Sequence, residues 1–136
     1  YIGILSTVNC SATVAHKIAE YFTPERLAEY PNIDGVCAFA HGTGCGMEMT
    51  GEPMDLLRRT MAGYARHANL AGALIVGLGC ERNQLKGLMK EQNLEAGERL
   101  HTFVMQDSGG TRKTVEAGIA AVKEMLPAAN RVVRQK

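Results

Sequence analysis

The sequence has no long apolar run, no secretory signal and no excess of either charge. No apolar run approaches the about 20 residues that a membrane-spanning helix requires, so we expect no membrane association. In the absence of a signal peptide, we expect a cytoplasmic protein. The formal net charge of +1 gives no reason to expect nucleic acid or a membrane surface as a partner.

Several familiar binding motifs are incomplete. The G-T-G-C-G stretch at 42–46 lacks the third glycine of the dinucleotide-binding fingerprint at the required distance. The GGTRKT stretch at 109–114 resembles a phosphate-binding loop but lacks its first glycine, so we reject ATP hydrolysis. No C-x-x-C pair occurs, and the absence of a secretory signal leads us to expect four free thiols.

The chain does contain a regular alternation of strand-like and helix-like segments, and its 136 residues suit one domain with a real core. Apolar segments predict strands at 1–8, 35–40, 72–79 and 99–105. The expected helices lie at 12–22, at 24–30, around Met54, Leu57, Met61 and Ala65, at 85–92, and along Val115, Ile119, Val122 and Leu126 until Pro127 ends the last one. Because strands covered on both faces are continuously apolar, this pattern predicts a three-layer, Rossmann-like α/β domain with about four parallel strands.

The segments that follow the four predicted strands are unusual in composition. They are residues 7–11, 41–46, 79–84 and 106–113, and they hold three of the four cysteines, one histidine and most of the clustered glycines. In a parallel sheet these segments lie along one edge, where ligands bind. Glycines let backbone N–H groups approach a ligand, and helix starts favour an anion. We therefore expect a small-molecule site at this edge.

Each candidate side chain has an ordinary alternative role. His41 is either a chemical group or a hydrogen-bonded structural histidine, and the glycines beside it either approach a ligand or form a tight turn. Glu81 is a general base, a metal ligand or the N-cap of the next helix. Three thiols on separate loops could converge on a soft metal or an iron–sulfur cluster, or could pack as small apolar side chains. They are Cys10, Cys45 and Cys80.

Four segments taken together resemble the galactarate/altronate dehydratase family of sugar-acid hydro-lyases. They are YIGILSTVNCSATVA, HGTGCGM, GALIVGLGCERNQ and GGTRKTVEAGIAAV, in this order along the chain. The resemblance implies a multidomain enzyme in which residues 1–128 form the middle domain and 129–136 begin a linker to a C-terminal domain. The start without methionine and the basic tail agree with that expectation.

The resemblance also implies the chemistry and the partners. We expect a hydro-lyase that converts galactarate or altronate to a keto-deoxy sugar acid, with a divalent metal, typically iron, bound mainly by the C-terminal domain. We expect a homodimer, contacts with the other domains of the same chain, and an inactive isolated fragment. Two alternatives stay open, namely a non-catalytic dimerisation scaffold and a domain of the large subunit of a sulfolactate sulfo-lyase.

Dehydration removes a proton beside a carboxylate and expels a hydroxyl from the next carbon, so it needs a base, an acid and stabilisation of an enediolate. Carried onto this chain, the resemblance nominates His41 and Glu81 as catalytic residues. Expected substrate-binding residues are Asn9, Gly44, Asn83, Gln84, Gly109 and Gly110. The candidate metal ligands are Cys10, Cys45 and Cys80.

Overall fold

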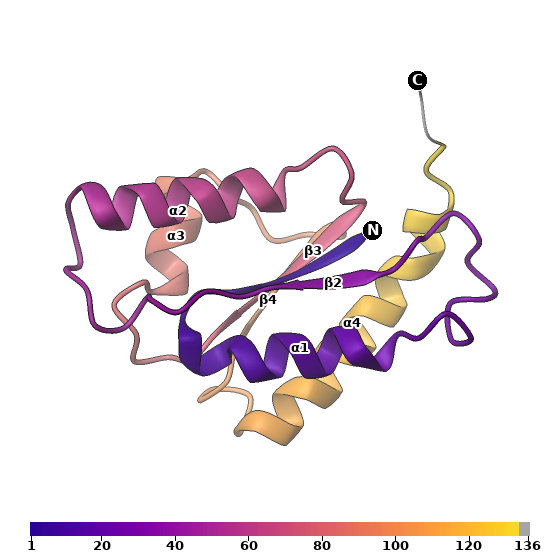
Figure 1. Ribbon diagram of the computed structural model, residues 1–136, viewed down its shortest axis with the longest axis horizontal. Coiled ribbons are helices and arrows are strands. Elements are labelled where there is room, and N and C mark those ends of the chain that lie inside the picture. Colours follow the sequence, from indigo (N-terminus) through magenta and orange to yellow (C-terminus); the bar gives the residue numbers. More distant parts are fainter. Residues whose placement is uncertain (134–136) are drawn as a thin grey trace.

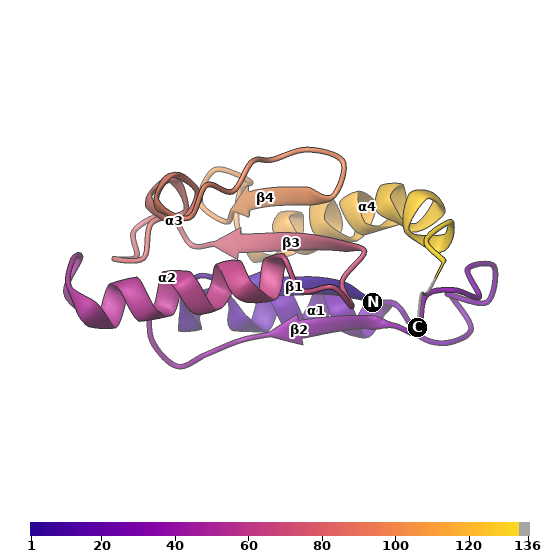
Figure 2. The same cartoon turned by 90° about the horizontal axis from the view of Figure 1, so that it is seen from above.

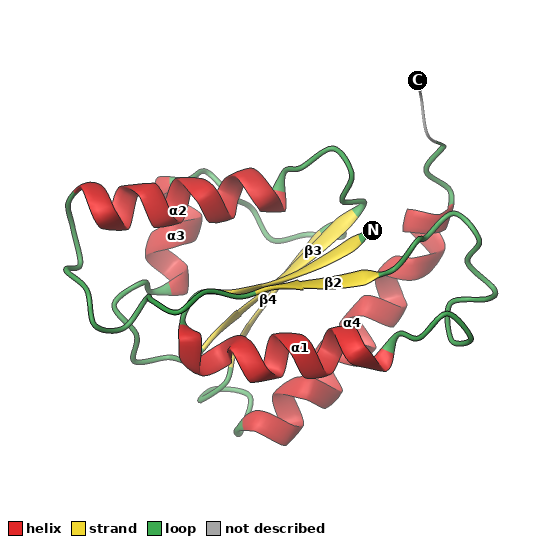
Figure 3. Cartoon of the chain, viewed as in Figure 1, coloured by secondary structure: helices red, strands yellow, loops and turns green. Residues whose placement is uncertain are grey.

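A computed structural model describes residues 1–133, in which strands and helices alternate along the chain (Figures 1 and 3). The strands are β1 (Ile2–Ser6), β2 (Val36–Phe39), β3 (Gly72–Gly77) and β4 (Leu100–Val104). The helices are α1 (Ala12–Tyr21), α2 (Glu52–Ala65), α3 (Leu85–Glu91) and α4 (Thr111–Asn130), and a short 3-10 turn at Asn9–Ser11 precedes α1. All strand pairs are parallel, in the order β2-β1-β3-β4. The predicted α/β fold with four parallel strands is confirmed.

The sheet lies between two helical layers, with α1 and α4 on one face and α2 and α3 on the other (Figures 1 and 2). Ile4, Leu74 and Val122 belong to the apolar cluster under α1 and α4. Leu5 and Ile75 belong to the cluster under α2 and α3. The central strands β1 and β3 therefore contribute to both clusters, which explains their continuous apolar sequences, whereas the edge strands β2 and β4 are only half-buried.

The prediction of a helix at 24–30 is wrong, because this segment forms successive turns. The Tyr30 N–H donates to the Leu27 carbonyl at 2.8 Å, and the Ile33 N–H donates to the Tyr30 carbonyl at 2.9 Å. These bonds each span three residues. They bend the chain so that both Leu27 and Ile33 are buried in the apolar cluster under α1 and α4. Burial of two side chains six positions apart thus overrides the local helix-start signal.

The expectation that Pro127 ends the last helix is also wrong, since α4 continues to Asn130. A proline inside a helix removes one backbone hydrogen bond. Here Ala129 in the following turn is buried. The side-chain oxygen of Asn130 accepts the Asn32 N–H at 2.9 Å, and the Asn32 side-chain amide donates to the Asn130 carbonyl at 2.7 Å. These contacts hold the last turn in place.

The linker expected at 129–136 falls partly within this helix. Residues 129 and 130 belong to α4, and residues 134–136 lie outside the described residues. Among the described residues no helix is both long enough and apolar enough to cross a membrane.

Candidate functional site

The carboxyl ends of the strands lie at one edge of the sheet, at the left in Figure 2. Backbone hydrogen bonds connect the loops that leave this edge. The Asn9 N–H donates to the Thr43 carbonyl at 3.0 Å, which joins the loop after β1 to the loop after β2. The Asn83 N–H donates to the Gly44 carbonyl at 3.0 Å, and the Gln106 N–H donates to the Leu78 carbonyl at 3.0 Å. The loops after all four strands are therefore linked along one edge, as the sequence predicts.

In the strand order, β2 lies beside β1 toward one end of the sheet, whereas β4 lies beside β3 toward the other end. The gap between β1 and β3 is thus the point at which open α/β sheets bind ligands. Glu81 fills this position and is only 3% exposed. One carboxylate oxygen accepts the Thr7 hydroxyl at 2.7 Å and the Leu78 N–H at 3.1 Å, and the other accepts the Gly79 N–H at 2.6 Å. The carboxylate joins the loops after β1 and β3.

His41 connects the loop after β2 to β1. Its Nε2 lies 3.0 Å from the Ser6 carbonyl oxygen, and its Nδ1 lies 3.3 Å from the Thr43 backbone nitrogen. These partners assign the neutral ring with the proton on Nε2, which donates to Ser6 while Nδ1 accepts from Thr43. Burial lowers the pKa of His41, and the hydrogen bond to the Ser6 carbonyl partly opposes that shift. The ring is therefore held neutral with both nitrogens bonded to its own chain.

The loop after β2 requires a glycine at position 44. Its φ of +99° is unfavourable for other residues. A Cβ at this position would lie 2.8 Å from the Val8 Cα and closer still to the Thr7 carbonyl oxygen. In contrast, a Cβ at Gly42 or Gly46 would meet nothing within 4 Å. The glycine thus permits contact between two loop backbones.

Two amides complete the connections between the loops. The Asn83 side chain is fully buried, and its nitrogen donates to the Thr7 carbonyl at 3.0 Å. The Gln84 side-chain nitrogen lies 3.0 Å from the Gly79 carbonyl and 2.7 Å from the Glu81 carbonyl. Both amide nitrogens therefore bond to the loops themselves. Their expected substrate-binding role stays a prediction.

Arg58 is a member of this network that sequence reasoning missed. It lies on α2, is only 5% exposed, and donates from Nε to the Asn83 side-chain oxygen at 3.2 Å. Its guanidinium also pairs with the Glu91 carboxylate at 2.5 Å. A Cβ at Gly87 would lie 2.6 Å from Nη2, so that glycine leaves room for the guanidinium. The available signal was a charged residue four positions after Met54 on the apolar side of the predicted helix.

The side chain of Asn9 and the glycines Gly109 and Gly110 take no part in the hydrogen bonds that involve Glu81 and Asn83. Asn9 is exposed, and its backbone N–H rather than its side chain makes the bond to Thr43. Gly109 and Gly110 have φ values of +86° and +97° and form the turn into α4. The Gly110 carbonyl accepts the hydroxyl of Thr114 at 2.8 Å. These glycines shape the start of α4.

Comparison with known proteins places these loops in a family. Residues 1–130 match the family model described as the second domain of D-galactarate dehydratase/altronate hydrolase. The chain belongs to this family. It is 30% identical over 131 residues to an altronate dehydratase of Bacillus subtilis (strain 168), which covers 94% of this chain and 24% of that protein.

A second relative in the family gives the same result. The chain is 30% identical over 124 residues to an altronate dehydratase of Escherichia coli (strain K12), covering 91% of this chain and 24% of that protein. The chain thus spans about a quarter of the length of the curated relatives that it matches. No solved structure matches the chain. The resemblance noted from the sequence is confirmed at the level of the family and of the second domain.

The metal that the family resemblance implies has no ligand group in the described part of the chain. Within residues 1–133, no three or more His, Cys, Asp or Glu side chains are grouped so that they could hold a metal ion. The three candidate thiols of Cys10, Cys45 and Cys80 are all exposed. In the described part of the chain these thiols therefore do not converge into a group that could hold a metal ion.

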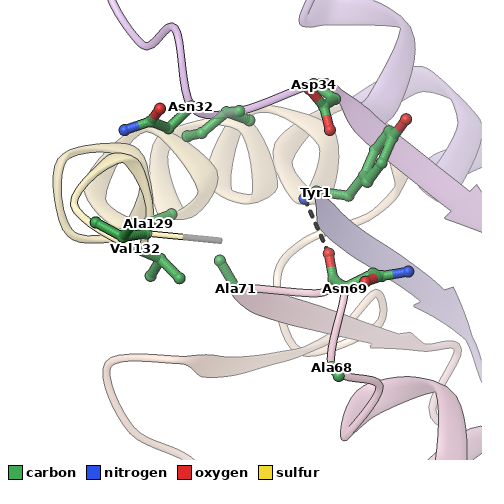
Figure 4. Close-up of a pocket in the computed structure, with 10 residues that line it drawn as sticks. Tyr1, Asn32, Asp34, Ala68, Asn69, Ala71, Ala129 and Val132 are labelled. Carbon is green, nitrogen blue, oxygen red and sulfur yellow. Dashed lines mark hydrogen bonds between the residues drawn. The ribbon is translucent and has the colours of Figure 1, made fainter. Parts of the chain in front are cut away.

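Two of the cavities in the described part of the chain differ in their position relative to the linked loops. A groove of about 640 Å³ runs between α3 and β4, and Gln84, Lys86, Lys90 and Gln106 are among its lining residues. A second pocket of about 510 Å³ is lined by residues such as Tyr1, Ala71 and Val132 (Figure 4). The latter lies at the amino ends of the strands, where the Tyr1 amino group donates to the Asn69 carbonyl at 3.0 Å. It is at the opposite edge from the linked loops.

Proposed function

We propose that the chain is one domain of a hydro-lyase that removes water from a sugar acid such as altronate or galactarate. The family match over residues 1–130 supports this proposal, as do two relatives that are both named altronate dehydratase. Because the chain spans about a quarter of those relatives, the activity belongs to the whole protein. We expect the isolated domain to be inactive.

In this proposal the linked loops at the carboxyl edge form one wall of the substrate site. The observation that carries the proposal is the set of hydrogen bonds that holds the four loops together, through Thr43, Gly44 and Leu78. Enzymes gain rate when the groups around a substrate are held in fixed positions before the reaction. The exposed side chains of Asn9 and Cys80 are then the groups that this wall presents to a substrate.

The catalytic roles expected for His41 and Glu81 stay predictions. Their hydrogen bonds favour a role in positioning the loops, because both ring nitrogens and both carboxylate oxygens already have partners within the chain. The same bonds also support the second candidate function, in which the domain is a non-catalytic scaffold. An iron or other divalent metal, a homodimer and a cytoplasmic location likewise remain predictions.

The test compares kinetics of the full-length protein with altronate, galactarate and sulfolactate as substrates. Asn9→Ala and Cys80→Ser change exposed side chains at the carboxyl edge, and His16→Ala changes an exposed residue on α1 as the matched control. If the edge is a wall of the site, the first two variants lower kcat/KM for a sugar acid at least about tenfold, and the control does not.

Each other outcome points to a definite alternative. Wild-type kinetics in Asn9→Ala and Cys80→Ser would favour the scaffold. Turnover of sulfolactate alone would instead identify a sulfo-lyase. No turnover of any of the three acids by the metal-loaded wild-type protein would contradict the proposed activity.

A further inference from the structure

The point between β1 and β3 is where this fold is expected to receive a ligand, and it is already filled by the protein. Three donors meet there, namely the Leu78 N–H, the Gly79 N–H and the Thr7 hydroxyl. Backbone N–H groups at the carboxyl end of a central strand are suited to bind an anion from a ligand. In this protein the anion that they bind is the carboxylate of Glu81.

The surrounding backbone is shaped for this carboxylate. A Cβ at Gly77 would lie 2.8 Å from the Glu81 carboxylate oxygen, so a larger residue at the end of β3 would displace the carboxylate from its present position. Gly79 has a φ of +127°, and its N–H makes the shortest of the three bonds, at 2.6 Å. Two glycines thus bring the main chain around the carboxylate.

This arrangement disfavours two of the three roles expected for Glu81, the general base and the N-cap. A general base must reach a proton of the substrate. Glu81 borders the groove between α3 and β4, but its side chain is buried, and its oxygens are bonded to donors of the protein. The N-cap position of α3 belongs to Gln84, and the backbone groups that Glu81 binds precede it in the chain.

We propose that Glu81 is an internal ligand whose carboxylate occupies the anion position of the fold at the β1/β3 point. Removal of its side chain then creates a binding site for a small free carboxylate such as acetate or formate. Glu81 is accordingly a positioning residue that holds the loops after β1 and β3 together. The consequence for catalysis rests on the proposed function: the carboxylate of a sugar acid cannot use this position, and it binds elsewhere.

The experiment measures the thermal stability of the full-length Glu81→Ala protein in the absence of substrate. The variant leaves three donors without their acceptor, so we expect its Tm to fall by at least about 5 °C. Acetate and formate at constant ionic strength raise that Tm in a saturable manner, because a ligand that binds only the folded state stabilises it. Acetamide, which is neutral and of similar size, does not reproduce the rise.

Three further proteins complete the experiment. Wild type and Glu116→Ala, whose carboxylate is exposed and pairs with Arg112 on α4, show no specific response to acetate. Glu81→Gln keeps the side-chain volume but places an amide N–H₂ group against the donors of the loops. We expect it to fold with a lower Tm than wild type and without an acetate response, because its side chain fills the site. This variant keeps the test decisive if Glu81→Ala does not fold.

Two results would overturn the proposal. One is a folded Glu81→Ala protein whose Tm responds to acetate no more than to chloride. The other is a Glu81→Gln protein with wild-type Tm and a kcat reduced about 10²-fold or more, as expected for loss of a general base. Since acetate binding is measured without turnover, its failure is distinct from failure of the proposed dehydratase activity.

Discussion

The two edges of the sheet differ in how their connections are made. All five glycines with positive φ among the described residues lie in connections that leave the carboxyl ends of strands, namely Gly44, Gly51, Gly79, Gly109 and Gly110. The one non-glycine residue with positive φ in that part of the chain, Asn93, lies after α3 at the other edge. That other edge carries the pocket of Figure 4, with exposed Tyr1, Val132 and Val133.

The two edges also differ in whether their polar side chains are buried. Glu81, Asn83 and Arg58 are buried, and the side chain of each is hydrogen-bonded to a residue of the loops at the carboxyl edge. The Asn32–Asn130 pair at the amino edge is exposed. A buried polar group without a partner costs far more free energy than an exposed one, which water can satisfy. The carboxyl edge should therefore be the more sensitive of the two edges to substitution.

The largest effect is expected for Gly44→Ala. The new Cβ would collide with the backbone of Thr7 and Val8, and φ is +99°. We expect a loss of about 3 kcal/mol in the free energy of unfolding. The matched control in the same loop is Gly42→Ala, where a Cβ has open space. Chemical denaturation measures the free energy of unfolding of both variants. Equal stability of the two would contradict the conclusion that this loop is held by backbone contact.

A smaller effect is expected for Asn83→Ala. The change leaves the Thr7 carbonyl and the Arg58 Nε without their partner in a buried place, which costs about 2 kcal/mol in the free energy of unfolding. Asn9→Ala, at an exposed position in the same edge, should change stability by less than about 0.5 kcal/mol. Urea midpoints compare the two variants. If Asn9→Ala lowered the free energy of unfolding as much as Asn83→Ala, burial would not explain which positions are sensitive to substitution.

The amino edge should respond less to loss of its polar pair. Asn32→Ala removes two exposed hydrogen bonds to Asn130 and should cost about 1 kcal/mol. Hydrogen exchange of the last turn of α4 should increase in this variant, because these bonds help to hold the turn after Pro127. A cost above that of Asn83→Ala would reverse the proposed order of the two edges.

The smallest effect is expected for the titration of His41. Its pKa is lowered in the folded protein, mainly by burial. The unfolded chain therefore binds more protons as the pH falls below the ordinary pKa of about 6.5, and stability is lost between that pH and the lower folded-state pKa. His41→Gln should flatten this dependence, whereas His16→Gln at an exposed position should not. Tm values across pH 4.5–7.5, about the range in which histidine titrates, provide the measurement, and an unchanged slope in His41→Gln would contradict it.

Local sequence patterns predicted most of the fold. The structure confirms the strands β1 and β3, which were predicted from continuous apolar runs. It also confirms α2 and α4, which were predicted from apolar residues at helical spacing, such as Met54 and Met61 in α2 and Val122 in α4. The two errors, at 24–30 and at Pro127, have one cause. Local signals are weak compared with the burial of Leu27 and Ile33 and with the contacts of Asn130, all of which depend on distant parts of the chain.

The sequence by itself determined that four special loops share one edge of a parallel sheet, because strand direction and connection length leave little choice. Only the tertiary structure decided what those loops do with their polar groups. Thr7 and Glu81 are 74 residues apart in the chain, and their contact exists only because β1 and β3 are neighbours in the sheet. A side chain's partners depend on packing in three dimensions, so the sequence nominated Glu81 without revealing that it binds its own protein.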